Sequence, residues 1–336
     1  MTLRKSICSL MALTLSASMA AAAPSDIEWT DDVANNPVTG NPGFGDGRTY
    51  YAHVVWDEES NVWHAWYDAS SGFDVGYAVS NGPDGIEFGD YQPVTGFTTD
   101  VQSKPFVLKT GPSEFRMWYM ANEREGGYHI YTAVSIDGVN WTDDQMVSGI
   151  AYDPDGSPQF GPVERIAVEQ LPNGDFVAYC RCEEFFLDEA DEFFDQGKKL
   201  FRYVSEDGIN WTWTGYTGVN EIEELGGMEF SSVIQHPAYE DVWYAWGNNA
   251  NSSGPFYSFV SNDGGLTFEL DEAPVLGVGE IGTQSYNADR NYHPSVTYMG
   301  DGQWVMFRTV AEPKRTARAT GVEDVPTTSV ADWSVF

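Results

Sequence analysis

Five cationic side chains stand at or just before short apolar segments that are spread along the chain. They are Arg48, Lys104, Arg165, Arg290 and His293. A guanidinium group binds carboxylate or sulfate through paired hydrogen bonds, so a cluster of such residues is typical of a site for an anionic ligand. Salt bridges to the neighbouring acids Glu164, Glu229 and Asp289 are an equal alternative. Either arrangement requires a fold that brings these segments to one place.

A turn signature recurs along the chain and indicates an internal repeat. It occupies residues 80–88, 135–141, 205–211 and 261–268, and each copy begins with serine and contains Asp-Gly. Asp-Gly between β-rich segments is a strong hairpin signal, because such a turn needs positive φ. The copies are evenly spaced except between the second and the third, where residues 183–198 form an extra segment.

Two strand-like segments precede each turn. The aromatic ones are residues 63–67, 115–119, 176–179, 242–246 and 304–307, the last without an Asp-Gly turn. The apolar ones before them are residues 51–54, 104–107, 165–168, 230–233 and 293–296. With one further strand between each aromatic segment and its turn, each unit reads strand, strand, strand, turn, strand, which is the pattern of a propeller blade. The sequence predicts an all-β, five-bladed β-propeller.

Two segments compete to complete the fifth blade. Residues 28–32 resemble residues 140–144, an outer strand of the second blade, so the N-terminal strand can close the ring. Residues 331–336 are the other candidate, and the sequence does not decide between them.

The extra segment, residues 183–198, predicts a short helical insertion in blade three. Phe186, Ala190, Phe193 and Phe194 fall at helical spacing with acidic residues between them. We expect this helix to pack against blade three, with a mobile lid as the alternative.

The N-terminal residues 1–23 have the features of a signal peptide. Arg4 and Lys5 precede an apolar stretch and a run of alanines. An N-terminal anchor helix is the alternative. We expect residues 24–336 to form one propeller domain in a secreted or periplasmic protein. The formal charge of the whole chain is -34, which argues against nucleic acid and anionic membranes as partners.

Cys180 and Cys182 are the two cysteines that follow the predicted signal peptide. In a strand they point to the same face, which is a poor geometry for a disulfide between them. Two buried thiols are therefore expected rather than a disulfide or a metal site.

The chain resembles the five-bladed propeller glycosidases of the arabinanase, invertase and levansucrase superfamily, and is nearest to glycoside hydrolase family 43. The resemblance rests on Pro-x-Val, Met-Trp-Tyr and Ser-x-Asp-Gly-x-x-Trp, seen best in residues 104–141, and covers nearly all of the chain after residue 23. It implies a glycosidase in which axial carboxyl groups share the chemistry. One activates water or attacks carbon, one protonates the leaving oxygen, and a third tunes the acid.

The resemblance also implies roles for single residues. Glu229, four residues before Val233, matches the general acid, although the family's proline is missing. Glu164 has the same phase and matches the modulator. His293 matches a histidine that binds a central water or a cation such as calcium, although no cofactor is expected to be required. Tyr51 stands where the family has its catalytic aspartate, and Asp46 in a nearby loop is the closest replacement.

Three hypotheses follow for the function. The first is a secreted glycoside hydrolase that acts on a polysaccharide or oligosaccharide, with Asp46, Glu164 and Glu229 as the catalytic carboxyl groups. The cationic residues favour a uronic or sulfated sugar, with Arg48, Tyr51, Lys104, Arg165 and Arg290 as binding residues. The second is a non-catalytic propeller that binds carbohydrate or a surface. The third is a sialidase-like site built from Tyr51, Glu164 and arginines.

Overall fold

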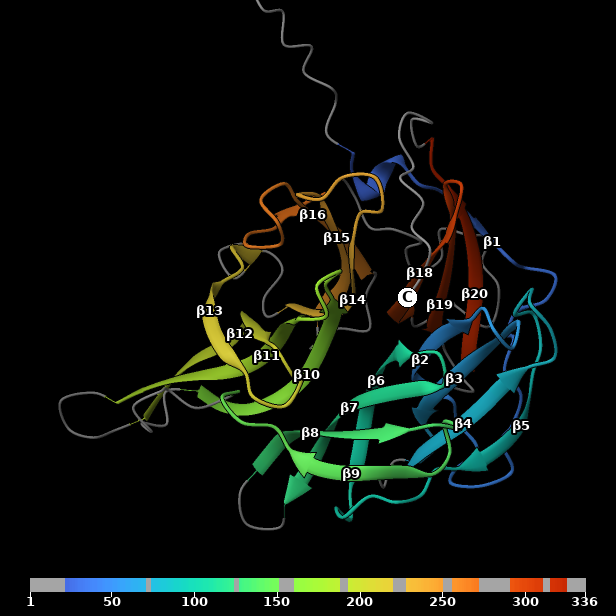
Figure 1. The fold of residues 1–336 in the computed structure, drawn as a ribbon, viewed down its shortest axis with the longest axis horizontal. Coiled ribbons are helices and arrows are strands. Elements are labelled where there is room, and N and C mark those ends of the chain that lie inside the picture. The colour runs from blue at the N-terminus through green and yellow to red at the C-terminus, as the bar shows by residue number, and fades with distance from the viewer. Residues whose placement is uncertain are drawn as a thin grey trace, which may run out of the picture.

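A computed structural model describes residues 22–70, 74–123, 127–150, 160–187, 193–219, 228–249, 256–271, 291–310 and 315–324. These residues form five four-stranded antiparallel sheets that stand around a common centre (Figure 1). The only helix among them is a 3-10 turn, η1 (Pro24–Asp26). The described residues therefore contain no helix that is long and apolar enough to cross a membrane.

Each blade is built from strands that are consecutive in sequence, except for the outermost strand of the fifth. Blade one holds β2 (Tyr50–Asp57), β3 (Val62–Asp68), β4 (Val75–Ser80) and β5 (Phe88–Pro93). Blade two holds β6 (Gln102–Gly111), β7 (Glu114–Glu123), β8 (Gly127–Ser135) and β9 (Trp141–Met146). Blade three holds β10 (Phe160–Gln170), β11 (Phe176–Leu187), β12 (Phe193–Ser205) and β13 (Thr212–Tyr216). Blade four holds β14 (Met228–Gln235), β15 (Trp243–Asn249), β16 (Phe256–Ser261) and β17 (Glu269–Leu270).

Blade five joins the two ends of the described chain. It holds β18 (Asn291–Gly300), β19 (Gln303–Val310), β20 (Arg315–Val322) and β1 (Glu28–Asp31). The strand β1 pairs antiparallel with β20, and the buried Arg308 donates from Nη2 to Asp31 Oδ1 at 2.7 Å. The N-terminal strand therefore closes the ring, while residues 331–336 lie outside the described residues. The predicted five-bladed propeller is confirmed.

The predicted helix in residues 183–198 is wrong where the structure describes this segment. There, β11 and β12 continue as a long hairpin, with Phe186 opposite Phe194 and Leu187 opposite Phe193. Residues 188–192 lie outside the described part. Apolar residues at helical spacing also fit a hairpin, and the pairing of β11 with β12 satisfies the backbone N–H and C=O groups. Cys180 and Cys182 of β11 are both buried and are not joined by a disulfide, as predicted.

The Asp-Gly turns hold neighbouring blades together. The indole of Trp66 in blade one donates to Gly138 O of blade two at 2.7 Å, and Trp118 of blade two donates to Gly208 O of blade three at 2.8 Å. Tyr179 of blade three donates its hydroxyl proton to Gly265 O of blade four at 2.5 Å. The repeated turn and the repeated aromatic residue are thus the two halves of one contact, which explains why they recur together.

The segment that links blade two to blade three also contacts the Asp-Gly turn of blade three. Ser148, just after β9, donates its amide to Ile209 O and accepts from the amide of Trp211, both at 2.9 Å. Gly149 follows with φ of +80°, and a Cβ there would lie 1.8 Å from Trp211 O. Only glycine fits this approach of two backbones.

We expect Gly149→Ala to lower the free energy of unfolding by about 3 kcal/mol, because left-handed backbone costs about 1–2 kcal/mol and overpacking adds about 1–3 kcal/mol. Gly174→Ala is the matched control, since its φ is +93° but nothing lies within 4 Å of the added Cβ. The control should lose only the backbone part, about 1–2 kcal/mol. Denaturant unfolding of both variants measures the difference, and equal losses would contradict the proposed contact.

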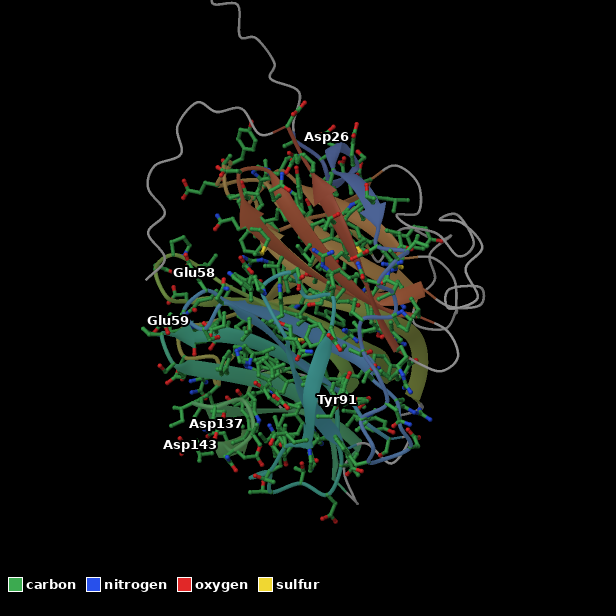
Figure 2. All side chains as sticks on the ribbon, turned by 90° about the vertical axis from the view of Figure 1, so that its right-hand side faces the viewer. Asp26, Glu58, Glu59, Tyr91, Asp137 and Asp143 are labelled. Carbon is green, nitrogen blue, oxygen red and sulfur yellow. The ribbon has the colours of Figure 1, made fainter. Side chains whose placement is uncertain are left out.

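The Asp-Gly turns lie at the opposite end of the blades from the beginnings of the inner strands. Figure 2 shows Asp137 of one such turn on the same side of the molecule as Glu58 and Glu59, which lie between β2 and β3. This end therefore carries part of the excess negative charge. Lys104, Arg165 and His293 stand near the beginnings of the inner strands and therefore belong to the other end.

Candidate active site

The inner strands β2, β6, β10, β14 and β18 contact one another around the centre of the ring. Each has a one-residue shift of register near its beginning. The shifts fall between Tyr50 and His53, Ser103 and Phe106, Val163 and Arg165, Phe230 and Ser232, and Tyr292 and Ser295. A β-bulge of this kind re-aims side chains. The five blades thus repeat one irregularity at one end of the axis.

Three bulky residues at these shifts have left-handed backbone. The φ angles of Tyr51, Lys104 and His293 are 53°, 52° and 54°. Such a conformation costs a non-glycine residue about 1–2 kcal/mol. Strain of this kind, repeated in three blades, is typical of functional sites.

The tyrosine at the first of these positions is the centre of a side-chain cluster. The ring of Tyr51 lies 4.0 Å from the imidazole of His293, centroid to centroid. Lys104 Nζ lies 5.3 Å and Arg165 Cζ 5.7 Å from the centroid of Tyr51. Tyr51 and Lys104 are partly exposed, whereas Arg165 and His293 are buried. Blades one, two, three and five therefore meet at this ring.

Blade four contributes a buried glutamate. Arg181 of β11 donates from Nη1 to Glu229 Oε2 at 3.0 Å, and both side chains are 2% exposed. Burial acts to raise the pKa of Glu229, but the positive charges of Lys104, Arg165 and Arg181 and the bond from Arg181 outweigh it and hold the pKa below its ordinary value. Glu229 is therefore an ionised carboxylate at neutral pH.

The histidine of the cluster is neutral. Arg165 Nη1 lies 2.8 Å from His293 Nδ1, and because a guanidinium group only donates, Nδ1 accepts. Glu229 Oε1 lies 3.3 Å from the same nitrogen, but an unprotonated nitrogen is not an ion-pair partner for a carboxylate. Burial and the charges of Arg165 and Lys104 lower the pKa of His293 well below its ordinary value, in agreement with this assignment.

A second buried carboxyl group lies next to the cluster, and sequence reasoning missed it. Asp68, at the end of β3, is 3% exposed. It accepts from Ser103 Oγ at 2.6 Å and from the amide of Lys104 at 2.9 Å. Burial raises the pKa of Asp68 to about 7, although its two hydrogen bonds and the charges of Lys104 and Arg165 oppose this.

The missed residues share one position in the repeat. Asp68 and Arg181 each come two residues after the aromatic residue that contacts the next blade, Trp66 or Tyr179. In the sheets, Asp68 lies opposite Tyr50 and Arg181 opposite Arg165. A charged residue at the end of an aromatic strand was the signal in the sequence that could have found them.

The structure separates the residues predicted from the sequence into three groups. It brings together Tyr51, Lys104, Arg165, Glu229 and His293. Asp46 and Arg48 instead pair with each other, Arg48 Nε to Asp46 Oδ1 at 2.7 Å, with side chains 34% and 25% exposed. The backbone of Glu164 belongs to β10, but its side chain, like Arg290, lies outside the described residues.

The described side chains around His293 do not fit a calcium ion. Calcium takes six to eight oxygen ligands. In the described ranges, no three histidine, cysteine, aspartate or glutamate side chains are placed to hold a metal ion. The positive charges of Lys104, Arg165 and Arg181 lower the pKa values of Glu229 and His293, and the same charges would repel a cation.

No protein-family model and no curated protein matches the sequence. Solved structures do match the fold. A glycosyl hydrolase from Bacteroides ovatus is 15% identical, with 88% of this chain and 93% of that chain covered and a TM-score of 0.59. A thermostable family-43 glycoside hydrolase is 14% identical, with 85% of this chain and 90% of that chain covered and a TM-score of 0.55. Xylan β-1,4-xylosidase from Bacillus halodurans is 14% identical, with 84% of this chain and 53% of that chain covered and a TM-score of 0.53. The resemblance to five-bladed propeller glycoside hydrolases is confirmed at the level of the fold.

Proposed function

We propose that this protein is a glycoside hydrolase whose active site is the axial cluster around Tyr51 and Glu229. The observation that carries the proposal is the buried Glu229 carboxylate, which Lys104, Arg165 and Arg181 hold ionised at the end of the axis where four other blades bring side chains. Glycoside hydrolases of known structure that share the fold support the choice of reaction class. The signal-like N-terminus supports export to the periplasm or the medium.

Hydrolysis of a glycosidic bond needs one ionised and one protonated carboxyl group. The resemblance alone implies that Glu229 is the acid, but its contact with Arg181 favours the ionised role. In that role Glu229 activates water. Glu164 remains a proposed modulator on the strength of its position beside Arg165. The ion pair of Asp46 with Arg48 supports a position at the rim rather than contact with the scissile bond.

We further propose a uronic or sulfated sugar as the substrate unit. Lys104, Arg165 and Arg181 surround Glu229 in a chain whose formal charge is -34. Lys104 is the partly exposed member of the three and stands beside the partly exposed Tyr51. An ammonium group over the face of a sugar-stacking ring is well placed to bind the carboxylate or sulfate of that sugar.

Matched pairs of 4-nitrophenyl glycosides test this preference, for example the glucuronide against the glucoside and the galacturonide against the galactoside. We expect the wild type to favour one uronide, and Lys104→Met to lower its kcat/KM by about 10-fold or more, since a hydrogen bond to a charged group contributes about 1.5–3 kcal/mol. The neutral partner should change little. Lys109→Met on the same strand, whose ammonium pairs with Asp57, is the control. Preference for neutral glycosides would refute the anionic sugar.

The second candidate is a propeller that binds carbohydrate without cleaving it. Its supporting observation is the seclusion of both carboxyl groups, since Glu229 and Asp68 are 2% and 3% exposed. Reducing-sugar release from a panel of neutral, uronic and sulfated polysaccharides separates the two. Release by the wild type supports the hydrolase. Calorimetric binding to a polysaccharide without any release would support the binding protein.

A further inference from the structure

The two buried carboxyl groups of the axial cluster differ in what holds them. Glu229 receives a charge-assisted hydrogen bond from the guanidinium of Arg181. Asp68 receives a hydroxyl group, from Ser103, and one backbone amide, from Lys104. A guanidinium stabilises only the anion, whereas a hydroxyl group can also accept from a protonated acid. The contacts therefore stabilise the anion of Glu229 more strongly than that of Asp68, which has no hydrogen bond from a charged side chain to offset its burial.

The charges that face Asp68 do not reverse this difference. Lys104 of β6 and Arg165 of β10 lower its pKa, but burial dominates and leaves the pKa at about 7. The negative charge of Asp68 in turn raises the pKa of Tyr51 on β2. Environments that push the pKa values of two carboxyl groups apart are the arrangement by which acid and base roles are divided.

Tyr51 links the two carboxyl groups. Burial comes first among the causes that raise its pKa, followed by the charge of Glu229 and, more weakly, the charge of Asp68. The neutral phenol therefore lies within electrostatic reach of both. Tyr51 is partly exposed while the carboxyl groups are buried, so Tyr51 is the member of this trio that a ligand can cover.

We propose that Asp68 is the proton-donating carboxyl group of the axial site and that Glu229 is its ionised counterpart. This rests on the proposed function. As the glycosidic C–O bond breaks, its electron pair stays on the leaving oxygen, which takes the proton of Asp68. Glu229 takes a proton from water, whose oxygen bonds to the anomeric carbon. Asp68 is left ionised and Glu229 protonated, and exchange of one proton through solvent restores both.

Two substrates of the same sugar test the role. Asp68→Asn should lower cleavage of a methyl glycoside or an oligosaccharide by about 10²-fold or more, the usual contribution of a general acid. Cleavage of the 4-nitrophenyl glycoside should fall far less, because 4-nitrophenolate leaves without a proton. In the wild type, activity on the first substrate should decline as the pH rises through about 7. This decline should be absent in the variant.

A measurement without substrate tests the charge state separately. Infrared difference spectra of the wild type between pH 6 and pH 8 should show the C=O band of a protonated carboxyl group that is lost as the pH rises through about 7. Glu169, whose pKa burial raises to about 8, contributes a second such band, so the assignment is made in a Glu169→Gln background. There the band should be missing when Asp68→Asn is added and present when Asp143→Asn, which changes an exposed aspartate, is added. No such band in Glu169→Gln would overturn the proposal even if Asp68→Asn failed to fold.

The outcomes distinguish this inference from the proposed function. If the wild type cleaves glycosides but Asp68→Asn loses the same fraction of its activity on both substrates, only the role of Asp68 is refuted. If the wild type cleaves no glycoside, the hydrolase itself is refuted, and the proton-donor role with it.

Discussion

Glu229→Gln should lower kcat on a cleaved glycoside by about 10³-fold, within the range that acid–base residues contribute. Glutamine keeps an oxygen that can accept from Arg181, but it has no negative charge with which to take a proton from water. The measurement is the rate of sugar release under saturating substrate, at a temperature where circular dichroism shows the variant folded.

Glu169→Gln is the matched control for this loss. Glu169 is a glutamate near the far end of β10, and burial raises its pKa to about 8, so glutamine imitates its neutral form. The control should keep the activity of the wild type. Similar activity in Glu229→Gln and the wild type would remove Glu229 from the reaction.

Arg181→Met should lower the free energy of unfolding by about 3–5 kcal/mol, because it leaves the Glu229 carboxylate buried without its partner. The side chains of Arg181 and Glu229 are both 2% exposed, so water does not replace the lost contact. Denaturant unfolding with the two single variants and the double variant measures the coupling.

The double variant Arg181→Met, Glu229→Gln should recover a large part of the loss, since no uncompensated charge remains. Additive losses in the double variant would show that the two side chains do not depend on each other. In that case the ionised state of Glu229 would have to come from Lys104 and Arg165 instead.

The propeller was predictable because its signals are local. The Asp-Gly turns and the aromatic residues are short motifs, and contacts such as that of Trp66 with Gly138 need one of each, so the two recur together. The false helix in blade three came from apolar spacing, which fits helix and hairpin alike. There, the register of β11 with β12 decided the outcome.

The site was predictable only in part, because its remaining members depend on cross-strand pairing. Glu229, Lys104 and Arg165 were predicted from their positions at the beginnings of the inner strands. Asp68 and Arg181 stand on the second strands, opposite Tyr50 and Arg165, and a register of this kind is set by tertiary packing. The left-handed backbone of Tyr51 was equally hidden, since no glycine marks it. Tyr51 stands where the resemblance implies an aspartate, and the carboxyl group of Asp68 lies on the neighbouring strand, β3.

The proposed site is tested most directly by a crystal structure of Glu229→Gln soaked with an oligosaccharide that the wild type cleaves. We expect a sugar ring in contact with Tyr51, its carboxylate or sulfate at Lys104, and a glycosidic bond beside residues 68 and 229. Sugar bound elsewhere on the molecule, with nothing over Tyr51, would contradict it.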